Sequence, residues 1–210
     1  MKYKVMIVED QTMPRELFEL RVQASERFEL ALSIDNAALA DVYCLRFPVD
    51  LILMDVVTRG GESGLDAAER IKRAFPQIKI IIVTSMPECS YLSRAREIGV
   101  ESFWYKEEQR ESLLDVMERT MNGESVYPGA SPELTLGMAS SYQFTERELD
   151  ILREITSGDT NQEIADRLNM SVATVKTHIL NMLEKTGFRN RTELAVRARE
   201  SGLVILNRRN

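Results

Sequence analysis

The feature that most constrains the fold of this chain is a regular alternation of short apolar runs with amphipathic stretches over residues 1–122. The apolar runs are rich in Val and Ile and almost continuous, as expected for parallel strands that are buried on both faces. They cover residues 4–8, 29–34, 50–54, 79–83 and 101–105. The stretches that separate or follow them have the three-and-four spacing of helices with one apolar side, at residues 13–24, 37–47, 65–75, 87–98 and 111–121. Five strand–helix units predict an α/β fold with an open, doubly wound, five-stranded parallel sheet.

Polar residues follow four of the predicted strands, at the sheet edge where such folds bind ligands. They are Glu9 and Asp10 after the first strand, Asp55 after the third, Thr84 after the fourth and Lys106 after the fifth. Clustered carboxylates repel one another unless a cation is present, and hard oxygen ligands suit Mg²⁺. The central carboxylate would then be a nucleophile for a phosphoryl group, whose charge the cation, the hydroxyl and the ammonium would neutralise.

The segments VED, LILMD, VTS and the lysine of FWYK resemble the receiver domains of bacterial two-component response regulators, over about residues 1–122. The resemblance implies a flavodoxin-like sheet in which Asp55 accepts phosphate from a sensor histidine kinase. It also implies that Glu9, Asp10 and Asp55 bind Mg²⁺.

Further roles are carried over from the resemblance to single positions of this chain. Thr84 and Lys106 would contact the phosphoryl oxygens, and Phe103 would be the aromatic switch residue that reorients together with Thr84. A separate hypothesis concerns two apolar residues, Val57 and Met86, which border the expected phosphoryl site. We expect them to exclude a hydrolytic water, so that the phosphorylated form is long-lived. The loop after the acceptor, VVTRGGESG, departs from the family pattern because it lacks the usual proline and is one residue longer.

Residues 123–143 are dense in Gly, Pro and Ser and break both patterns, which is typical of a linker between domains. Ser131 followed by Pro132 predicts a short helix within the linker.

Residues 144–210 predict a small all-α domain with four helices. Two capping boxes, Thr145 with Glu148 and Thr160 with Glu163, begin the first two helices, which reach about residues 156 and 168. Ser171 caps a third helix to about residue 186, and a fourth covers residues 192–201. A short helix, a tight turn and a longer helix form the helix-turn-helix arrangement, whose second helix enters the major groove of DNA.

The segments FTERELDIL, NQEIADRL, SVATVKTHILNMLEKTG and NRTELA closely resemble the DNA-binding domain of NarL/LuxR-type regulators. The resemblance implies that four residues of the third helix face the groove: Thr174, Lys176, Thr177 and Leu180. It implies contacts with the DNA backbone by Asn161, Lys185, Asn190 and Arg191. Two alternatives stay open: Lys176 is a solvated surface lysine, and Leu180 either touches a thymine methyl group or is merely exposed.

Charge and composition support this division. The net charge of −6 is divided unevenly along the chain. Residues 1–141 have 16 Lys/Arg against 23 Asp/Glu, whereas residues 142–210 have 11 Lys/Arg against 10 Asp/Glu. An acidic first part does not bind nucleic acid by itself, whereas the second is neutral enough to bind DNA through one basic face. No apolar run approaches the roughly 18 residues of a membrane span, and no signal peptide is evident, so we expect a cytoplasmic protein.

The leading interpretation is a phosphorylation-controlled transcription regulator, not an enzyme, that binds double-stranded promoter DNA as a homodimer when phosphorylated. An aspartate-nucleophile phosphatase is disfavoured, because such enzymes need a second carboxylate two residues after the nucleophile, where this chain has Val57. A constitutive DNA-binding regulator with an unphosphorylated pseudo-receiver remains the alternative.

Overall fold

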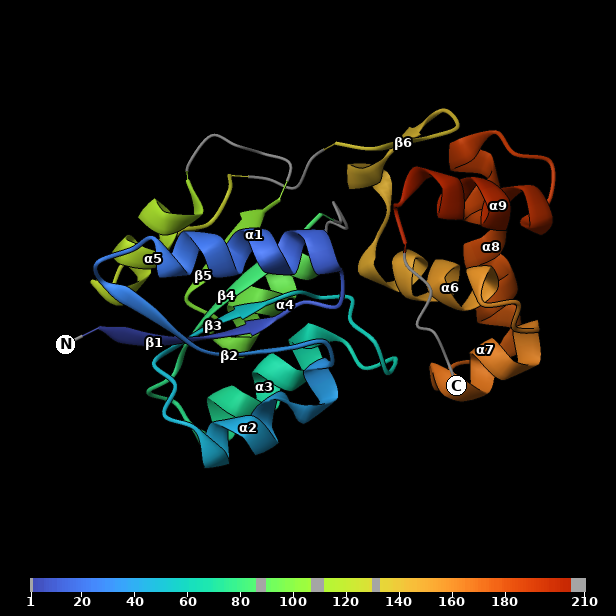
Figure 1. Cartoon of the computed structure of the whole chain (residues 1–210). Coiled ribbons are helices and arrows are strands. Elements are labelled where there is room, and N and C mark those ends of the chain that lie inside the picture. The colour runs from blue at the N-terminus through green and yellow to red at the C-terminus, as the bar shows by residue number, and fades with distance from the viewer. Residues whose placement is uncertain (1, 86–89, 107–111, 130–132, 205–210) are drawn as a thin grey trace. The chain divides into compact units, whose positions relative to one another are not determined.

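The structure, a computed structural model, describes residues 2–85, 90–106, 112–129 and 133–204. These residues form two compact units, one built on a parallel sheet and the other containing the C-terminal helices (Figure 1). We call them the sheet unit and the helical unit and describe each by itself. Among the described residues, no helix combines the length and the apolar character needed to cross a membrane.

The sheet unit contains the five predicted parallel strands. They are β1 (Tyr3–Val8), β2 (Phe28–Ile34), β3 (Leu51–Met54), β4 (Lys79–Thr84) and β5 (Ser102–Tyr105). Their order in the sheet is β2-β1-β3-β4-β5, so the direction of winding reverses between β1 and β3. Ligands of doubly wound sheets bind beyond the carboxyl ends of the strands at this reversal. The predicted α/β fold is confirmed, with strand ends within two residues of the expected ones.

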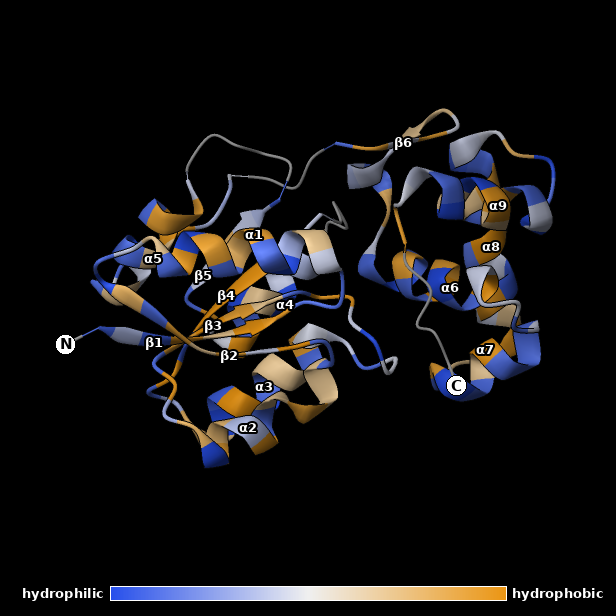
Figure 2. Cartoon of the chain, viewed as in Figure 1, coloured by the Kyte–Doolittle hydropathy of each residue, from blue (hydrophilic) through white to orange (hydrophobic). Residues whose placement is uncertain are grey.

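Helices cover both faces of the sheet (Figures 1 and 2). Residues of α1 (Thr12–Gln23) and α5 (Leu113–Met121) pack on one face, and residues of α2 (Ala40–Arg46), α3 (Gly64–Ala74) and α4 (Ser90–Ile98) pack on the other. The predicted helix at residues 37–47 begins with a separate 3₁₀ turn, η1 (Ala37–Leu39), which the Asn36 side chain caps. The first residues of the predicted helix at 87–98 lie outside the described residues.

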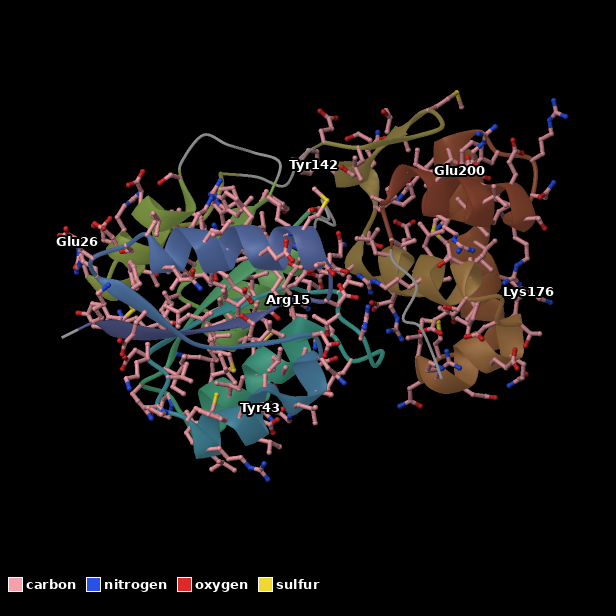
Figure 3. The ribbon with its side chains drawn as sticks, viewed as in Figure 1. Arg15, Glu26, Tyr43, Tyr142, Lys176 and Glu200 are labelled. Atoms are coloured by element: carbon pink, nitrogen blue, oxygen red, sulfur yellow. The ribbon has the colours of Figure 1, made fainter. Side chains whose placement is uncertain are left out.

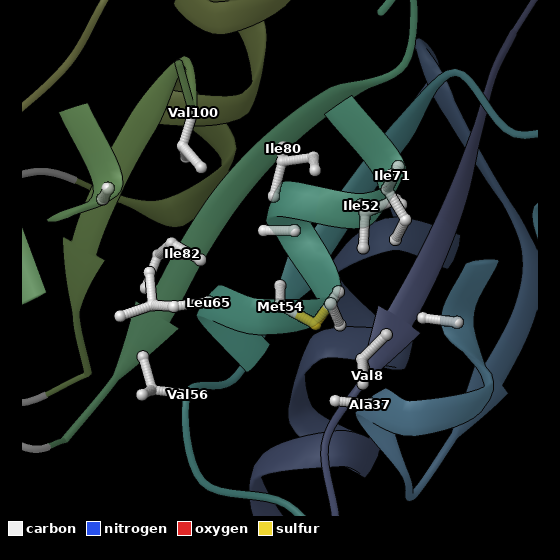
Figure 4. Close-up of a cluster of buried hydrophobic side chains, with 14 of the residues drawn as sticks. Val8, Ala37, Ile52, Met54, Val56, Leu65, Ile71, Ile80, Ile82 and Val100 are labelled. Carbon is white, nitrogen blue, oxygen red and sulfur yellow. The ribbon is translucent and has the colours of Figure 1, made fainter. Parts of the chain in front are cut away.

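The strands are nearly continuous apolar runs because both of their faces are buried. Met6, Ile52 and Ile80 belong to the core on the side of α2, α3 and α4. Figure 4 shows Ile52 and Ile80 within this cluster. Their neighbours Val5, Leu51 and Ile81 belong to the core on the side of α1 and α5. Successive side chains of a strand point to opposite faces, so each strand contributes to two cores.

The chain after α5 returns to the sheet unit before it leaves for the helical unit. The Phe103 amide donates to the Val126 carbonyl at 2.8 Å, and the Val126 amide donates to the Ser102 hydroxyl at 3.1 Å. Val126 is buried, and Tyr127 packs against the core beside it. Part of the segment treated as linker in the sequence analysis is therefore packed against β5.

The helical unit contains the four predicted helices, α6 (Glu146–Thr156), α7 (Asn161–Arg167), α8 (Val172–Thr186) and α9 (Arg191–Ser201). Both capping boxes are present, at Thr145 and at Thr160, and the Ser171 side chain caps α8. Gly187 ends α8 with a φ of 74°, in the left-handed region that glycine adopts without strain.

A β-hairpin precedes these helices, and the sequence analysis missed it. It consists of β6 (Thr135–Leu136) and β7 (Ala139–Ser140), followed by a 3₁₀ turn, η2 (Ser141–Gln143). Leu136 and Ala139 are buried in the core of the helical unit. Of the predicted linker helix, Ser131 and Pro132 lie outside the described residues, and Glu133, which follows them, is not helical.

Candidate functional sites

Three carboxylates meet at the carboxyl edge of the sheet, beside the point where the strand order reverses. Glu9 and Asp10 follow β1, and Asp55 follows the neighbouring strand β3. Each offers an oxygen that lies within 4.8 Å of the others. Glu9 and Asp55 are only 1% and 4% exposed. Three hard oxygen donors this close form a donor set that fits a divalent cation such as Mg²⁺.

Lys106 connects the two buried carboxylates. Its Nζ atom donates to Oδ2 of Asp55 at 2.9 Å and also to Oε2 of Glu9. Its backbone amide donates to the carbonyl oxygen of Thr84 at 2.9 Å, so the ends of β4 and β5 are joined where the lysine enters the site. The structure thus brings Glu9, Asp10, Asp55 and Lys106 together, as predicted, with the buried Thr84 at the adjacent strand end.

Burial changes the acidity of the central carboxyl. Desolvation raises the pKa of Asp55 from its usual 3.8 to about 6, against the lowering effect of Lys106, and the negative charge of Glu9 adds to the rise. Two buried carboxylates beside one ammonium are therefore under-neutralised at pH 7. A bound cation would relieve this excess of negative charge.

Backbone hydrogen bonds fix the position of Asp55. Its amide donates to the Val8 carbonyl at 2.9 Å, and its Oδ1 atom accepts from the Val56 amide at 2.7 Å. Gly64 donates its amide to the Val56 carbonyl at 2.8 Å, and a Cβ atom on Gly64 would lie 1.9 Å from the carbonyl oxygen of Asp55. Gly64 was missed by the sequence analysis, although a glycine at the start of the helix that follows the acceptor loop was a usable signal.

The long loop after Asp55 is anchored on the connection that follows β2. Thr58 is buried, and its hydroxyl accepts from the Ala37 amide at 2.9 Å. The Arg59 amide donates to the Asp35 carbonyl at 3.2 Å. Val57 is half-buried and forms a β-bridge with Ser63. Met86, the second residue expected to exclude water, lies outside the described residues.

The structure gives Phe103 two aromatic neighbours and Glu9 a basic one. Phe103 is buried, and its ring lies 5.0 Å from that of Tyr105 and 6.3 Å from that of Tyr127. Arg15 of α1 donates to the carbonyl oxygen of Glu9 at 3.1 Å. The sequence analysis singled out Phe103 but neither Arg15 nor Tyr127, because their contacts depend on how α1 and the segment after α5 pack.

The helical unit exposes one side of α8. Its buried side includes Val175, Ile179 and Met182, which pack in the core with residues of α6 and α9. The opposite side is exposed and includes the four residues predicted to face the groove: Thr174, Lys176, Thr177 and Leu180. Figure 3 shows Lys176 pointing away from the body of the helical unit.

The four residues predicted to contact the DNA backbone all have partners within the helical unit. Lys185 donates to both carboxylate oxygens of Glu148, at 2.8 and 2.6 Å. Arg191 donates to Oδ1 of Asn161 at 2.9 Å, which ties α9 to α7. The Asn190 side chain caps α9 by accepting from the Glu193 amide at 3.0 Å. Each therefore has a structural role, whatever it contributes to DNA binding.

Models of two protein families match the two parts of the chain. The family described as "Response regulator receiver domain" matches residues 5–118, and "Bacterial regulatory proteins, luxR family" matches residues 142–198. The response regulator protein VraR of Staphylococcus epidermidis is 32% identical over 212 residues, which cover 97% of this chain and all of the relative.

Solved structures share the fold. A complex of the response regulator RcsB with DNA has a TM-score of 0.62 at 18% identity, covering 94% of this chain and 98% of the other. RcsB of Salmonella enterica serovar Typhimurium, bound to a promoter in the presence of the phosphate mimic BeF₃⁻, has a TM-score of 0.61 at 20% identity, covering 97% and 100%. The chain belongs to the response regulators that join a receiver domain to a LuxR-type DNA-binding domain, a family of transcription regulators.

Proposed function

We propose that this response regulator is switched by phosphorylation of Asp55 and then binds promoter DNA as a homodimer. The observation that carries the proposal is the geometry around Asp55: a fixed, buried carboxylate, two more acidic residues beside it, and an ammonium group in contact. A purely structural carboxylate at a strand end would not require this excess of buried negative charge. The same cluster is what in-line attack on a phosphoryl group requires.

Each residue of the cluster has a role in this proposal. A carboxylate oxygen of Asp55 forms the new O–P bond, while the N–P bond to the phosphohistidine of a sensor histidine kinase breaks. Glu9, Asp10 and Asp55 would hold Mg²⁺, which supplies positive charge to the phosphoryl oxygens when bound. Lys106, already in contact with Asp55, stays as a fixed positive charge beside the transferred group. Thr84 would contact another phosphoryl oxygen.

The switch would couple this site to the rest of the receiver domain. Thr84 ends β4, and Phe103 lies on the adjacent strand β5, where Ile82 of β4 is its partner in the pairing. A shift of Thr84 toward the phosphoryl group would leave space for the ring of Phe103 and change the surface formed by α4, β5 and α5. That change would favour dimers or release the DNA-binding domain.

For DNA binding, the exposed side of α8 would enter the major groove, with Thr174, Lys176, Thr177 and Leu180 at the bases. The residues near the phosphates would be Asn161, Lys185, Asn190 and Arg191. The protein would carry out this function in the cytoplasm. RcsB dimers bound to DNA have a TM-score of 0.61 to this chain at 18% identity, covering 94% of this chain and 98% of theirs, which supports the fold required. Two copies of α8 would read two half-sites.

Val57 supports a long lifetime for the phosphorylated form. It lies two residues after Asp55, is half-buried and has an apolar side chain that cannot orient a hydrolytic water. We expect Val57→Asn to shorten the half-life of the phosphoryl group, measured by the decay of the phosphorylated mass after the donor is removed. Loss of the wild-type phosphoryl group within seconds would contradict this part of the proposal.

Intact mass spectrometry tests the central step. The full chain is incubated with Mg²⁺ and a small-molecule phosphodonor, alongside Asp55→Ala. The proposal predicts one added phosphoryl group on the wild type alone, and none when EDTA is present. A folded wild type that gains no mass would indicate a pseudo-receiver and constitutive DNA binding instead.

A further inference from the structure

The surface of α8 that faces solvent has an apolar centre. Ala173, Thr177 and Leu180 are all exposed, and their spacing of four and three residues places them on one line along the helix. Leu180 is 56% exposed and lies on the side of α8 opposite its buried stripe. The helical unit does not use this side chain for its stability.

Hydrogen bonds within the helix make the threonines on this surface less polar than their sequence indicates. The hydroxyl of Thr177 donates to the Ala173 carbonyl at 3.1 Å. The hydroxyl of Thr174 lies 2.7 Å from that of Ser171, the residue that caps α8. Because the Thr177 hydroxyl has donated its proton to the helix, it can offer a base only acceptor lone pairs, and the methyl groups of both threonines stay open to apolar contacts.

Charge selects which part of α8 can approach DNA. From Val172 to Leu183 the helix contains one lysine, Lys176, and no acidic residue, whereas Glu184 follows one turn after Leu180 on the same line. A carboxylate repels the phosphate backbone, so the part that approaches DNA ends at Leu180. Lys176 lies beside the apolar line, where it can contact a guanine or a phosphate.

We infer that Leu180 is a specificity-determining residue that recognises the methyl group of a thymine in each half-site. The inference rests on the proposed entry of α8 into the major groove. In that groove the C5-methyl group of thymine is the one apolar feature of the base pairs, and an apolar side chain is its natural contact. A leucine side chain has no hydrogen-bond donor or acceptor, so it cannot recognise the polar groups of the other bases.

The test needs DNA sites that the full chain selects from a random library after treatment with a phosphodonor. Each thymine of a selected duplex is then replaced in turn by deoxyuridine, which removes only the methyl group. We expect replacement at one position of each half-site to weaken wild-type binding by about three- to fivefold, as for the loss of one buried methyl group.

Variants assign this effect to one side chain. Leu180→Ala should bind the thymine and deoxyuridine duplexes equally, whereas Leu180→Met, which stays apolar, should keep most of the difference. Lys176→Ala should weaken binding to both duplexes and leave their ratio unchanged. The folding of each variant is checked by its melting temperature, which should not change because both side chains are exposed.

The outcomes separate this inference from the proposed function. If the full chain selects no DNA site, the proposed DNA binding itself is wrong. If it selects sites but no deoxyuridine replacement matters, or if the ratio survives in Leu180→Ala, the role of Leu180 is overturned while DNA binding stands.

Discussion

The ring of Tyr127 lies 6.3 Å from the ring of Phe103, so the segment that leaves the receiver domain packs directly against the residue expected to switch. The Tyr127 hydroxyl donates to the Val100 carbonyl at 2.7 Å, and the Arg96 guanidinium lies 4.7 Å from the centre of its ring. Burial raises the pKa of Tyr127, so the hydroxyl stays protonated and keeps this hydrogen bond at physiological pH.

These contacts predict that Tyr127 stabilises the receiver domain. Tyr127→Phe should lower its free energy of unfolding by about 1 kcal/mol, the usual worth of one hydrogen bond, and Tyr127→Ala by about 3 kcal/mol. Urea unfolding followed by the fluorescence of Trp104 measures this, because Trp104 is the single tryptophan and lies in the sheet unit. Tyr43→Phe is the matched control on α2, and a wild-type midpoint for Tyr127→Ala would contradict the prediction.

The close approach of Gly64 to the backbone of Asp55 predicts that no larger residue is tolerated at position 64. A methyl group there would collide with the carbonyl oxygen of Asp55, so Gly64→Ala should move the acceptor, destabilise the domain by about 2 kcal/mol and reduce phosphorylation. Gly129→Ala is the matched control, because a Cβ atom at Gly129 meets no atom within 4 Å. The phosphorylation rate, measured by intact mass, should fall for Gly64→Ala only. An unchanged rate for Gly64→Ala would contradict the prediction, because the loop would then accommodate the methyl group without moving the acceptor.

The raised pKa of Asp55 predicts a pH-dependent difference between the wild type and Asp55→Asn. A carboxyl group whose pKa is higher in the folded state stabilises the fold at low pH, and this stabilisation is lost as the pH rises through about 6. Without Mg²⁺, Asp55→Asn should therefore melt at a higher temperature than the wild type at pH 7.5 and at a similar temperature at pH 4. Adding Mg²⁺ at pH 7.5 should raise the melting temperature of the wild type more than that of the variant. A difference independent of pH would contradict this explanation.

Replacing Lys185 of α8 should destabilise the helical unit, whereas replacing Lys176 of the same helix should weaken DNA binding only. Burial disfavours the charged form of Glu148, but hydrogen bonds from Lys185 and from the Thr145 amide lower its pKa overall. The pair therefore stabilises the helical unit at neutral pH, and the stabilisation is lost in acid as Glu148 becomes protonated. Lys185→Met should lower hydrogen-exchange protection of α6 by about 2 kcal/mol, because it leaves the buried Glu148 without its cation.

The matched variant, Lys176→Ala, removes a cation from the exposed side of α8. It should leave this protection unchanged while weakening DNA binding by about tenfold and reducing the salt dependence of binding by about one counterion per protomer. Equal effects of the two variants on protection would show that Lys185 is not the structural lysine of the pair.

The sequence predicted the fold well because its signals were local and strong. Nearly continuous apolar strands, and the capping boxes at Thr145 and Thr160, do not depend on distant contacts. The meeting of the carboxylates at one edge followed from the topology alone, because the carboxyl ends of parallel strands lie along the same edge of a doubly wound sheet. The hairpin at β6 and β7 was missed because its two-residue strands are too short for any periodicity to show.

The contacts that fix the site were harder to predict. Gly64 is required by a close approach to the Asp55 carbonyl, and Tyr127 by packing across 24 residues of sequence from Phe103, which no local pattern encodes. The residues expected at the DNA backbone were named from the sequence, but their structural role was not foreseen. Lys185 and Arg191 donate hydrogen bonds inside the helical unit, and the sequence pattern did not predict these partners.

The most direct test of the whole account measures the affinity of the full chain for its selected DNA with and without phosphodonor, for the wild type and Asp55→Ala. The account predicts that the donor tightens binding by the wild type, together with a shift toward dimers, and leaves Asp55→Ala unchanged. A wild type that is shown by mass to be phosphorylated and yet binds DNA with the same affinity would contradict control by Asp55.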